Sequence, residues 1–585
     1  MLKCSPFCKI HNVLTAGILL FILFTFNITG CSSGLIQEVG LEDPQAEEEM
    51  EQHEEVDPDA LKEQERLQRE KEEREERERQ ERILEERRLR EEALKDELGP
   101  FFVPLPPLEK EDNPPVKARG IYVTGNTVGL TSRFEDLLHM VETTELNAMV
   151  IDVKNDHGVM SYRSDIEIVS EAGANRNVPV KDMQEVISRL KDKGIYTIAR
   201  IVVFRDPLLP EFKPEWAIQR NQGGVWRTRG GVAWVNPYDK QVWDYNIAIA
   251  KEAALVGFQE IQFDYVRFPE NAHRLDQEAY YPGEDGMPKD QAIENFLIYA
   301  GEQLEKYNVH LSADVFGVIA TSWGDTDRIG QTWEKIAPQV DYNCPMIYPS
   351  HYGPGYFGFS VPDANPSGTV RNALIDAIKR NAAIENPGII RPWLQSFTAS
   401  WVRGHIPYGT EEVREQIETA LELGIDEYLI WNARNNYFSD AFLSEEEARQ
   451  LRKDLQAERE KKGHDVLGNT AEDALKEYLE AVQKRNWREA LVYQSTDFTM
   501  DHKQFREWVG KWTGRLTSYE MITKDLDSDN SQFVLDVVIT NNQEELKLNN
   551  QKFEVFIENS IWRVKPPEDF TEMLTFVVED SQENN

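Results

Sequence analysis

Between residues 118 and 456 the sequence alternates eight times between a short apolar run and a longer run of amphipathic pattern. A short apolar run bounded by turn residues is typical of a buried β-strand, and apolar residues three or four apart are typical of a helix. Eight strand–helix units in about 340 residues match the size of a (β/α)8 TIM barrel. We therefore predict an α/β barrel with strands at 119–124, 148–153, 195–204, 258–264, 310–316, 341–348, 389–397 and 427–431, and helices at 134–146, 180–193, 238–256, 290–307, 328–337, 369–384, 410–423 and 444–458.

An open, doubly wound sheet is the other fold that this alternation allows. Doubly wound sheets that bind nucleotides carry a glycine-rich phosphate loop after the first strand. The run at 119–124 is not followed by such a loop. The closed barrel is therefore the favoured prediction.

The predicted fourth strand, within residues 257–269, carries polar side chains on one face. Glu260, Gln262 and Asp264 alternate with apolar residues, and residues two apart share a face of a strand. An ordinary core strand would not bury three polar groups, but a barrel strand can direct them along the barrel interior. Asp264 then stands at the carboxyl end, where barrel enzymes place catalytic groups. The plain alternative is an aspartate that caps the next loop.

Polar and aromatic residues also follow the other predicted strands. Because the carboxyl ends of barrel strands meet at one mouth, these residues should converge there. Carboxylates among aromatic rings suit a carbohydrate site, since sugar C–H faces pack on such rings and glycosidic cleavage needs two carboxyl groups. The candidate catalytic residues are Asp264, Asp314 and Asp152, and the candidate substrate-binding residues are Lys154, His157, Arg229, Trp234, Arg267, Tyr348, Trp393 and Trp431.

Several of these residues have structural alternatives. Asp152 could pair with Lys154 or Arg200 inside the barrel, His157 could be a hydrogen-bonding loop residue, and Trp431 could pack the end of the barrel.

The sequence also argues against several other kinds of chemistry. It has no His pair or Cys pair with zinc spacing and no Gly-x-Ser-x-Gly motif, so we predict neither a metal nor another cofactor, and an acyl hydrolase is disfavoured. A net charge of −39 argues against nucleic acid as a partner.

Residues 1–30 have the pattern of an export signal. Lys3 and Lys9 precede an apolar run at 13–26, and Ile28-Thr-Gly-Cys31 follows it. This resembles the bacterial lipoprotein signal, which implies cleavage before Cys31 and attachment of lipid to that residue. The alternatives are a plain secretory signal and an uncleaved anchor. We expect an exported chain, anchored by lipid to the membrane on its extracytoplasmic side.

Residues 31–117 are expected to form a stalk. The acidic run 42–59 suits a disordered spacer. The Glu/Arg-rich run 61–98 pairs opposite charges three and four residues apart but keeps no apolar heptad, which favours a single charged helix over a coiled coil. A proline-rich linker follows.

Residues 457–470 read as a linker, and residues 471–585 as a separate small α+β domain. Helices are predicted at 471–485 and 487–493, and strands at 517–523, 533–540, 545–550, 552–558 and 560–565. This order resembles the nuclear-transport-factor-like cone fold. The expected role is binding or spacing, and the alternative is a structural appendage.

The barrel resembles a bacterial family of glycoside-hydrolase-like TIM-barrel domains, long catalogued as a domain of unknown function and related to the α-amylase-like clan. The matching segments are 117–124, 151–156, 234–237, 257–269, 312–316 and 346–349. The resemblance implies a hydrolase of glycans with Asp264 as nucleophile. The acid/base carboxyl would be Asp314, where many relatives of the clan have glutamate, and Asp152 is a third candidate. We predict a surface-anchored glycoside hydrolase; the alternative is a non-catalytic lipoprotein that binds cell-wall glycan.

Overall fold

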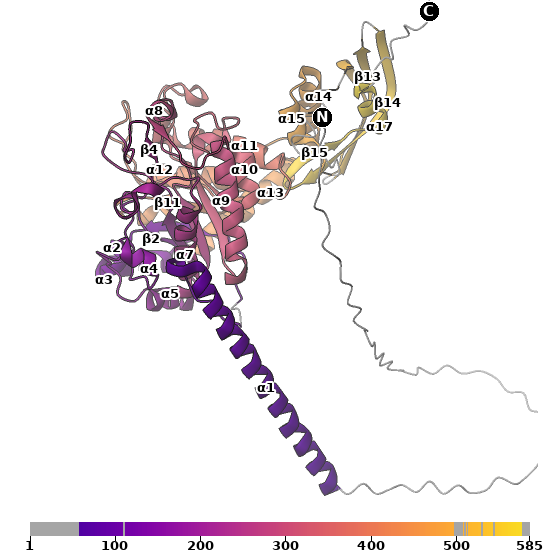
Figure 1. The fold of residues 1–585 in the computed structure, drawn as a ribbon. Helices are drawn as coiled ribbons and strands as arrows, with labels where there is room; N and C mark the ends of the chain where they lie inside the picture. Colours follow the sequence, from indigo (N-terminus) through magenta and orange to yellow (C-terminus); the bar gives the residue numbers. More distant parts are fainter. Residues whose placement is uncertain are drawn as a thin grey trace, which may run out of the picture. The chain divides into compact units, whose positions relative to one another are not determined.

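The computed structural model describes residues 58–108, 112–496, 507, 511, 513–527, 530–541 and 544–575 (Figure 1). The predicted signal segment, the lipidation residue Cys31 and nearly all of the acidic run lie outside the described residues. Within these described ranges, no helix has both the length and the apolar character needed to cross a membrane.

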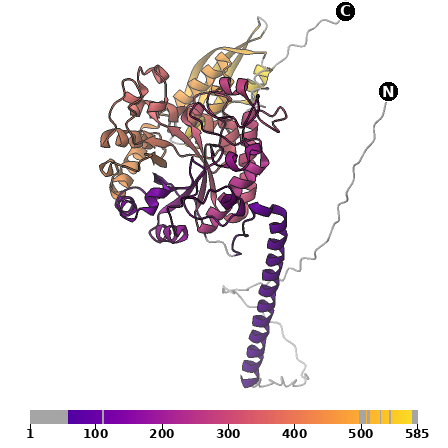
Figure 2. The same cartoon turned by 60° about the vertical axis from the view of Figure 1, so that its left-hand side comes forward.

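Eight parallel strands close into a barrel, as predicted, and the open sheet is excluded. Strand β10 pairs with both β8 and β11, and β11 pairs with β1, which joins the two ends of the sheet. Helices surround these strands in both views (Figures 1 and 2). The barrel strands are β1 (Arg119–Val123), β2 (Ala148–Lys154), β3 (Tyr196–Val202), β5 (Glu260–Asp264), β7 (His310–Phe316), β8 (Tyr342–Ile347), β10 (Trp393–Gln395) and β11 (Tyr428–Trp431).

Most predicted helices are present with small changes at their ends, but two predictions in the second half were wrong in extent. The helix expected at 328–337 is reduced to α10 (Trp333–Ile336), because Asp325 accepts the N–H groups of Ile329 and Gly330 and holds that segment in a turn. The strand expected at 389–397 is split into β9 (Ile389–Ile390) and β10 around Pro392, which has no N–H to donate. The other large helices are α3 (Thr131–Thr143), α5 (Met183–Asp192), α7 (Lys240–Val256), α9 (Lys289–Leu304), α11 (Pro366–Ala382), α12 (Thr410–Glu422) and α13 (Glu445–Lys462).

The polar face predicted for the fourth strand lies inside the barrel. Glu260, Gln262 and Asp264 of β5 are all buried, at its start, middle and end. Gln262 donates to the sulfur of Cys344, a buried free cysteine. Glu260 accepts two hydrogen bonds from the Arg391 guanidinium, at 2.8 and 2.9 Å. The inner face of β5 is therefore polar along its whole length.

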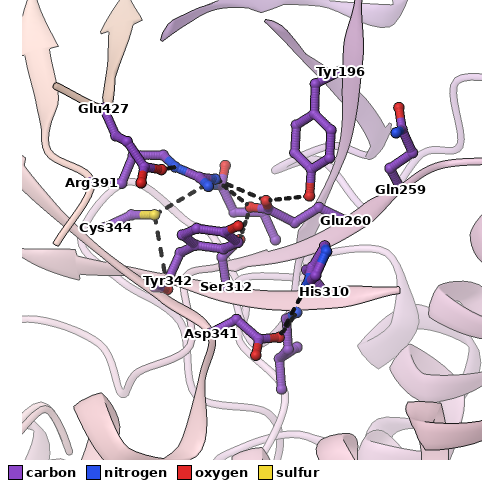
Figure 3. A network of polar contacts seen from close by, with 12 residues as sticks. Tyr196, Gln259, Glu260, His310, Ser312, Asp341, Tyr342, Cys344, Arg391 and Glu427 are labelled. Atoms are coloured by element: carbon purple, nitrogen blue, oxygen red, sulfur yellow. Dashed lines mark hydrogen bonds and ion pairs between the residues drawn. The ribbon is translucent and has the colours of Figure 1, made fainter. Parts of the chain in front are cut away.

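The amino-terminal end of this interior is a closed polar network (Figure 3). Besides Arg391, Glu260 accepts hydrogen bonds from the hydroxyls of Ser312, at 2.6 Å, and Tyr196, at 3.1 Å. Arg391 also donates to Glu427 at 3.1 Å. Glu260 and Arg391 have no solvent exposure, so each buried charge is compensated by the other, and the two hydroxyl donors complete the contacts of Glu260.

The predicted charged helix is α1 (Pro58–Leu98). Arginines along it pair with glutamates three and four residues away, as Arg88 does with Glu85 and Glu92. The helix ends at Gly99, whose φ of +52° suits glycine. The proline-rich segment beyond it is fastened at several points: Arg87 donates to two of its carbonyls, and Asn113 donates to two backbone carbonyls of the barrel.

The carboxyl-terminal region forms its own apolar core from a helical hairpin and an antiparallel sheet. The two strands predicted at 545–550 and 552–558 are one long strand, because Asn550 takes a φ of +55° and a nearby register shift absorbs the irregularity. The elements are α14 (Ala471–Lys484), α15 (Trp487–Tyr493), β12 (Arg515–Asp525), β13 (Asn530–Asn541), β14 (Glu544–Glu558), β15 (Ile561–Lys565) and α17 (Glu568–Thr575), a helix that the sequence analysis did not predict.

Candidate active site

A cavity of about 450 Å³ opens at the carboxyl ends of the barrel strands. Parallel strands bring their last residues to this end, and six of the predicted site residues line the cavity together. They are Asp264, Arg267, Asp314, Tyr348, Trp393 and Trp431.

Asp264, at the end of β5, is bound by an arginine of the neighbouring strand. Nε and Nη2 of Arg200 donate to Asp264 Oδ2 at 2.9 and 2.5 Å. The backbone N–H of Tyr265 donates to the other carboxylate oxygen at 2.6 Å. Three N–H donors therefore fix the orientation of Asp264 at the wall of the cavity.

Asp152, two residues before the end of β2, is the second carboxyl bound by Arg200. It accepts from Arg200 Nη1 at 2.6 Å and from the Tyr122 hydroxyl at 2.6 Å. Burial raises the pKa of the Asp152 carboxyl. Asp152 does not line the cavity, and the ion pair with Arg200 matches the structural alternative considered for it. Asp152 is therefore positioned to orient the Arg200 guanidinium.

Asp314, on β7, stands in a different environment. It is 2% exposed and accepts one hydrogen bond from the side chains, from Trp393 Nε1 at 2.6 Å. Burial, and then the charge of Asp264, raise the pKa of the Asp314 carboxyl well above its usual range. The cavity thus holds one carboxyl matched by a cation and a second one whose pKa is raised by burial and by the neighbouring charge.

Aromatic rings form the wall beside the two carboxyls. Trp431 stacks on Tyr122, with ring centres 4.1 Å apart, and meets Trp393 edge-on at 5.5 Å. The Arg200 guanidinium lies over the rings of both Tyr122 and Trp431. Packing therefore fixes Arg200 from its faces while the carboxylates fix it at its edge. The surface that faces the cavity is rigid and partly apolar.

The backbone is strained next to the site. Tyr265, directly after Asp264, has a φ of +51°, in the left-handed region that side chains other than glycine rarely adopt. Backbone strain of this kind persists only where the surrounding structure imposes it, and strained residues are enriched at functional sites. Here the turn supplies the N–H that binds Asp264 and directs the Tyr265 ring into the cavity wall.

A second cavity, of about 460 Å³, adjoins the first and shares Tyr265, Arg267 and Glu270 with it. Arg229 and Trp234, predicted from the long loop after β3, line this second cavity. Arg267 is buried and lines both. Two more predicted residues, Arg229 and Trp234, are thus brought to the site, although they do not touch the space beside Asp314.

Lys154 and His157, predicted to bind substrate, line neither cavity. Lys154 is fully buried and pairs with Asp206 at 2.9 Å, under the ring of Tyr245 on α7. Of the two partners considered for Asp152, Lys154 is therefore not the one it binds, because a register shift between the two residues reverses the alternation of β2. The His157 side chain is 73% exposed and lies beside Asp156, as its loop alternative suggested.

Other residues of the site were not among the predicted ones. Arg200 was considered only as a partner of Asp152. A charged residue inside a strongly apolar strand could have indicated that Arg200 belongs to the site. Trp401 was missed altogether: it is 68% exposed and stacks on Phe397, which meets Tyr348 of the cavity edge-on. Among the described residues, no group of three or more His, Cys, Asp or Glu side chains is arranged to bind a metal ion.

Comparison with protein families matches residues 120–437 to the family described as "Putative glycosyl hydrolase domain". The match spans more than half of the 585 residues, and the chain belongs to this family. Its barrel is thus a domain of the glycosyl hydrolase type. A search of the curated proteins finds no match.

Several solved structures are similar to the chain. A hypothetical protein from Ruminiclostridium thermocellum is 41% identical, covering 33% of this chain and 97% of its own, with a TM-score of 0.31. The PgaB (BpsB) glycoside hydrolase domain from Bordetella bronchiseptica is 14% identical over 60% of this chain and 99% of its own, with a TM-score of 0.40. The α-galactosidase TtGalA from Thermus thermophilus is 13% identical over 58% and 62%, with a TM-score of 0.35.

Proposed function

We propose that the chain is a surface-anchored glycoside hydrolase that cleaves a poly- or oligosaccharide with Asp264 and Asp314. The observation that carries this proposal is the unequal pair of carboxyls at one cavity. Asp264 is matched by Arg200, whereas burial and the Asp264 charge raise the pKa of Asp314. Two carboxyls in different protonation states are what glycosidic cleavage requires.

In the proposed reaction Asp314 is the acid. Its proton passes to the glycosidic oxygen as the bond from that oxygen to the anomeric carbon breaks, and the leaving sugar departs as an alcohol. Asp264 attacks the anomeric carbon or stabilises the positive charge that develops there. Water then supplies the new hydroxyl of the second product, and its proton returns to a carboxylate of the pair.

Two features of the cavity support a carbohydrate substrate. The rings of Trp393, Trp431 and Tyr348 provide faces for sugar C–H groups. Beyond them, the exposed ring of Trp401, stacked on Phe397, extends the aromatic surface outward. A glycan longer than one unit would find a stacking partner there.

The test uses the full-length protein and its Asp264→Asn variant, each incubated with peptidoglycan and a panel of bacterial and plant polysaccharides. Released sugars are followed by mass spectrometry. Release by the parent and not by the variant supports the hydrolase. If neither protein releases sugar and both sediment with one glycan, the chain is a glycan-binding protein instead.

The anchoring part of the proposal rests on the sequence around Cys31, outside the described residues. Lipid on this residue would hold the barrel at the outer side of the membrane, and α1 and the proline-rich segment would connect the anchor to the barrel along the chain. The test is expression of the chain beside a Cys31→Ser variant. The parent should fractionate with membranes and carry diacylglycerol by mass spectrometry, and the variant should not; equal membrane retention without lipid argues against the anchor.

A further inference from the structure

The second cavity is lined by an unusual concentration of positive charge. Arg205, Arg229, Arg267 and Arg274 contribute to its wall, beside one carboxylate, Glu270. The whole chain has the opposite bias, with 104 acidic and 65 Lys or Arg residues. This cavity is therefore a local exception to the charge of the protein, and it lies next to the two carboxyls of the candidate active site.

Packing holds Arg267 in place between the two cavities. Its guanidinium lies 5.2 Å from the ring centre of Trp234, 5.0 Å from that of Tyr265 and 4.3 Å from that of Phe316. One nitrogen donates to the Phe268 carbonyl and another to Glu270, at 3.0 and 2.9 Å. A cation fixed in this way gives a ligand a preorganised positive wall.

Three of the four arginines have carboxylate partners. Arg205 pairs with Asp156, Arg267 with Glu270, and Arg274 with Glu278. Arg229 differs from them, because within the described residues it makes no hydrogen bond or ion pair. Its exposed guanidinium can therefore accept a ligand without first breaking a contact.

The loop after β3 presents Arg229 on a braced hairpin. Isolated bridges join Ala217 to Val235 and Arg227 to Ala233 across the hairpin. Its strand β4 (Gln219–Arg220) pairs with β6 (Ala279–Tyr280), which follows helix α8 (Ala272–Glu278). The same hairpin carries Trp226 and Trp234, whose rings line the cavity. The Arg229 side chain and the rings of Trp226 and Trp234 thus line the same cavity.

We propose that this second cavity is a subsite for a negatively charged sugar of the substrate. A guanidinium binds a carboxylate or phosphate through two parallel hydrogen bonds, and an aromatic ring packs against the sugar body. The ligand class is a uronate or a phosphate-substituted sugar within the glycan. This inference rests on the proposed function, since it places the charged sugar one or a few units from the bond that Asp264 and Asp314 would cleave.

The experiment measures binding of the full-length protein to a uronate-containing polysaccharide and to the same polymer after chemical reduction of its carboxylates. A phosphodiester-linked wall polymer forms a third arm and separates carboxylate from phosphate ligands. The parent should bind at least one anionic polymer more tightly than the reduced polymer, and added salt should weaken this preference. Arg229→Gln should lower affinity for the anionic polymer about tenfold and leave the reduced polymer unaffected.

Arg220→Gln is the matched control. Arg220 is an exposed arginine of the same hairpin but does not line the cavity, so this variant removes the same charge without touching the subsite. Equal affinity of the parent for anionic and reduced polymers overturns the proposal, and so does an equal loss in the two variants.

Hydrolysis is scored separately from binding. Cleavage of neutral polymers alone, abolished by Asp264→Asn, would keep the hydrolase and remove the anionic subsite. Binding of anionic polymers that depends on Arg229, without any cleavage, would keep the subsite and remove the hydrolase.

Discussion

The barrel interior holds two arginine–carboxylate networks, one at each end of β5, and they are built alike. At the amino-terminal end Arg391 bridges Glu260 and Glu427. At the carboxyl end Arg200 bridges Asp264 and Asp152. In each network one guanidinium binds two carboxylates from other segments of the barrel wall, and an aromatic ring covers its face.

The two networks differ in what adjoins them. Glu260 and Arg391 have no exposure, and hydroxyls of neighbouring strands complete the contacts of Glu260. The network of Arg200 instead faces a cavity of about 450 Å³ that contains a further carboxyl, Asp314, without a cation of its own. A buried ion pair by itself therefore says little about catalysis. The additional carboxyl with its raised pKa, and the space beside it, are what distinguish the candidate active site.

The largest difference between the two networks should appear in activity. Asp264→Asn should lower the rate of sugar release about 10⁴-fold, because the amide can neither attack nor balance charge at the anomeric carbon. Glu427→Gln, which alters a buried carboxylate of the other network, should leave the rate nearly unchanged. Initial rates on the substrate identified from the panel measure both, and equal losses would mean that the Asp264 effect is structural.

Stability should show the reverse pattern. Arg391→Met should lower the free energy of unfolding by about 3–5 kcal/mol, because it leaves the Glu260 charge buried without its partner. The double variant Glu260→Gln/Arg391→Met should recover part of this loss. Urea unfolding followed by tryptophan fluorescence gives both values; a double variant no more stable than Arg391→Met would show that packing, not the unpaired charge, sets the loss.

Asp314→Asn should lower the rate by about 10²–10⁴-fold, the range of a general acid, while the fold is retained because the amide has nearly the same shape and its oxygen can still accept from Trp393 Nε1. The parent should lose activity as pH rises through the raised pKa of Asp314. Rates measured across the pH range for parent and variant test this. A parent whose activity persists at high pH would exclude Asp314 as the acid.

The same carboxyl should also affect stability. A buried acid whose pKa is raised in the fold contributes stability below its unfolded value, near 3.9, and this contribution is lost as pH rises through its folded value. Unfolding midpoints of the parent should therefore fall over that window more than those of Asp314→Asn. Parallel curves for the two proteins would contradict the raised pKa.

The smallest effect is expected at the edge of the site. Trp401→Ala should raise KM about two- to tenfold with little change in kcat, since a stacking contact contributes about 0.5–1.5 kcal/mol. Tyr280→Ala, an exposed aromatic residue outside both cavities, is the control. A change in kcat alone would mean that Trp401 acts on the chemistry and not on binding of the glycan.

Much of this arrangement could be predicted because it depends on periodicity. The alternation of strands and helices specified the closed barrel, and the period of two on β5 placed Glu260, Gln262 and Asp264 inside it. What periodicity cannot predict is a local change of phase. The register shift in β2 turned Lys154 away from Asp152. The pairing of Arg200 with two carboxyls depends on the register between neighbouring strands, which the sequence pattern does not give.

The turn at Tyr265 makes stability and function compete at one position. Glycine would adopt its φ of +51° without strain, so Tyr265→Gly would relieve the backbone. The same change would remove the ring that lines both cavities and packs on Arg205 and Arg267. Selection for thermal stability alone would therefore favour a variant in which the two arginines at the candidate active site are no longer held in place by the Tyr265 ring. Engineering of this protein for stability should leave residue 265 unchanged.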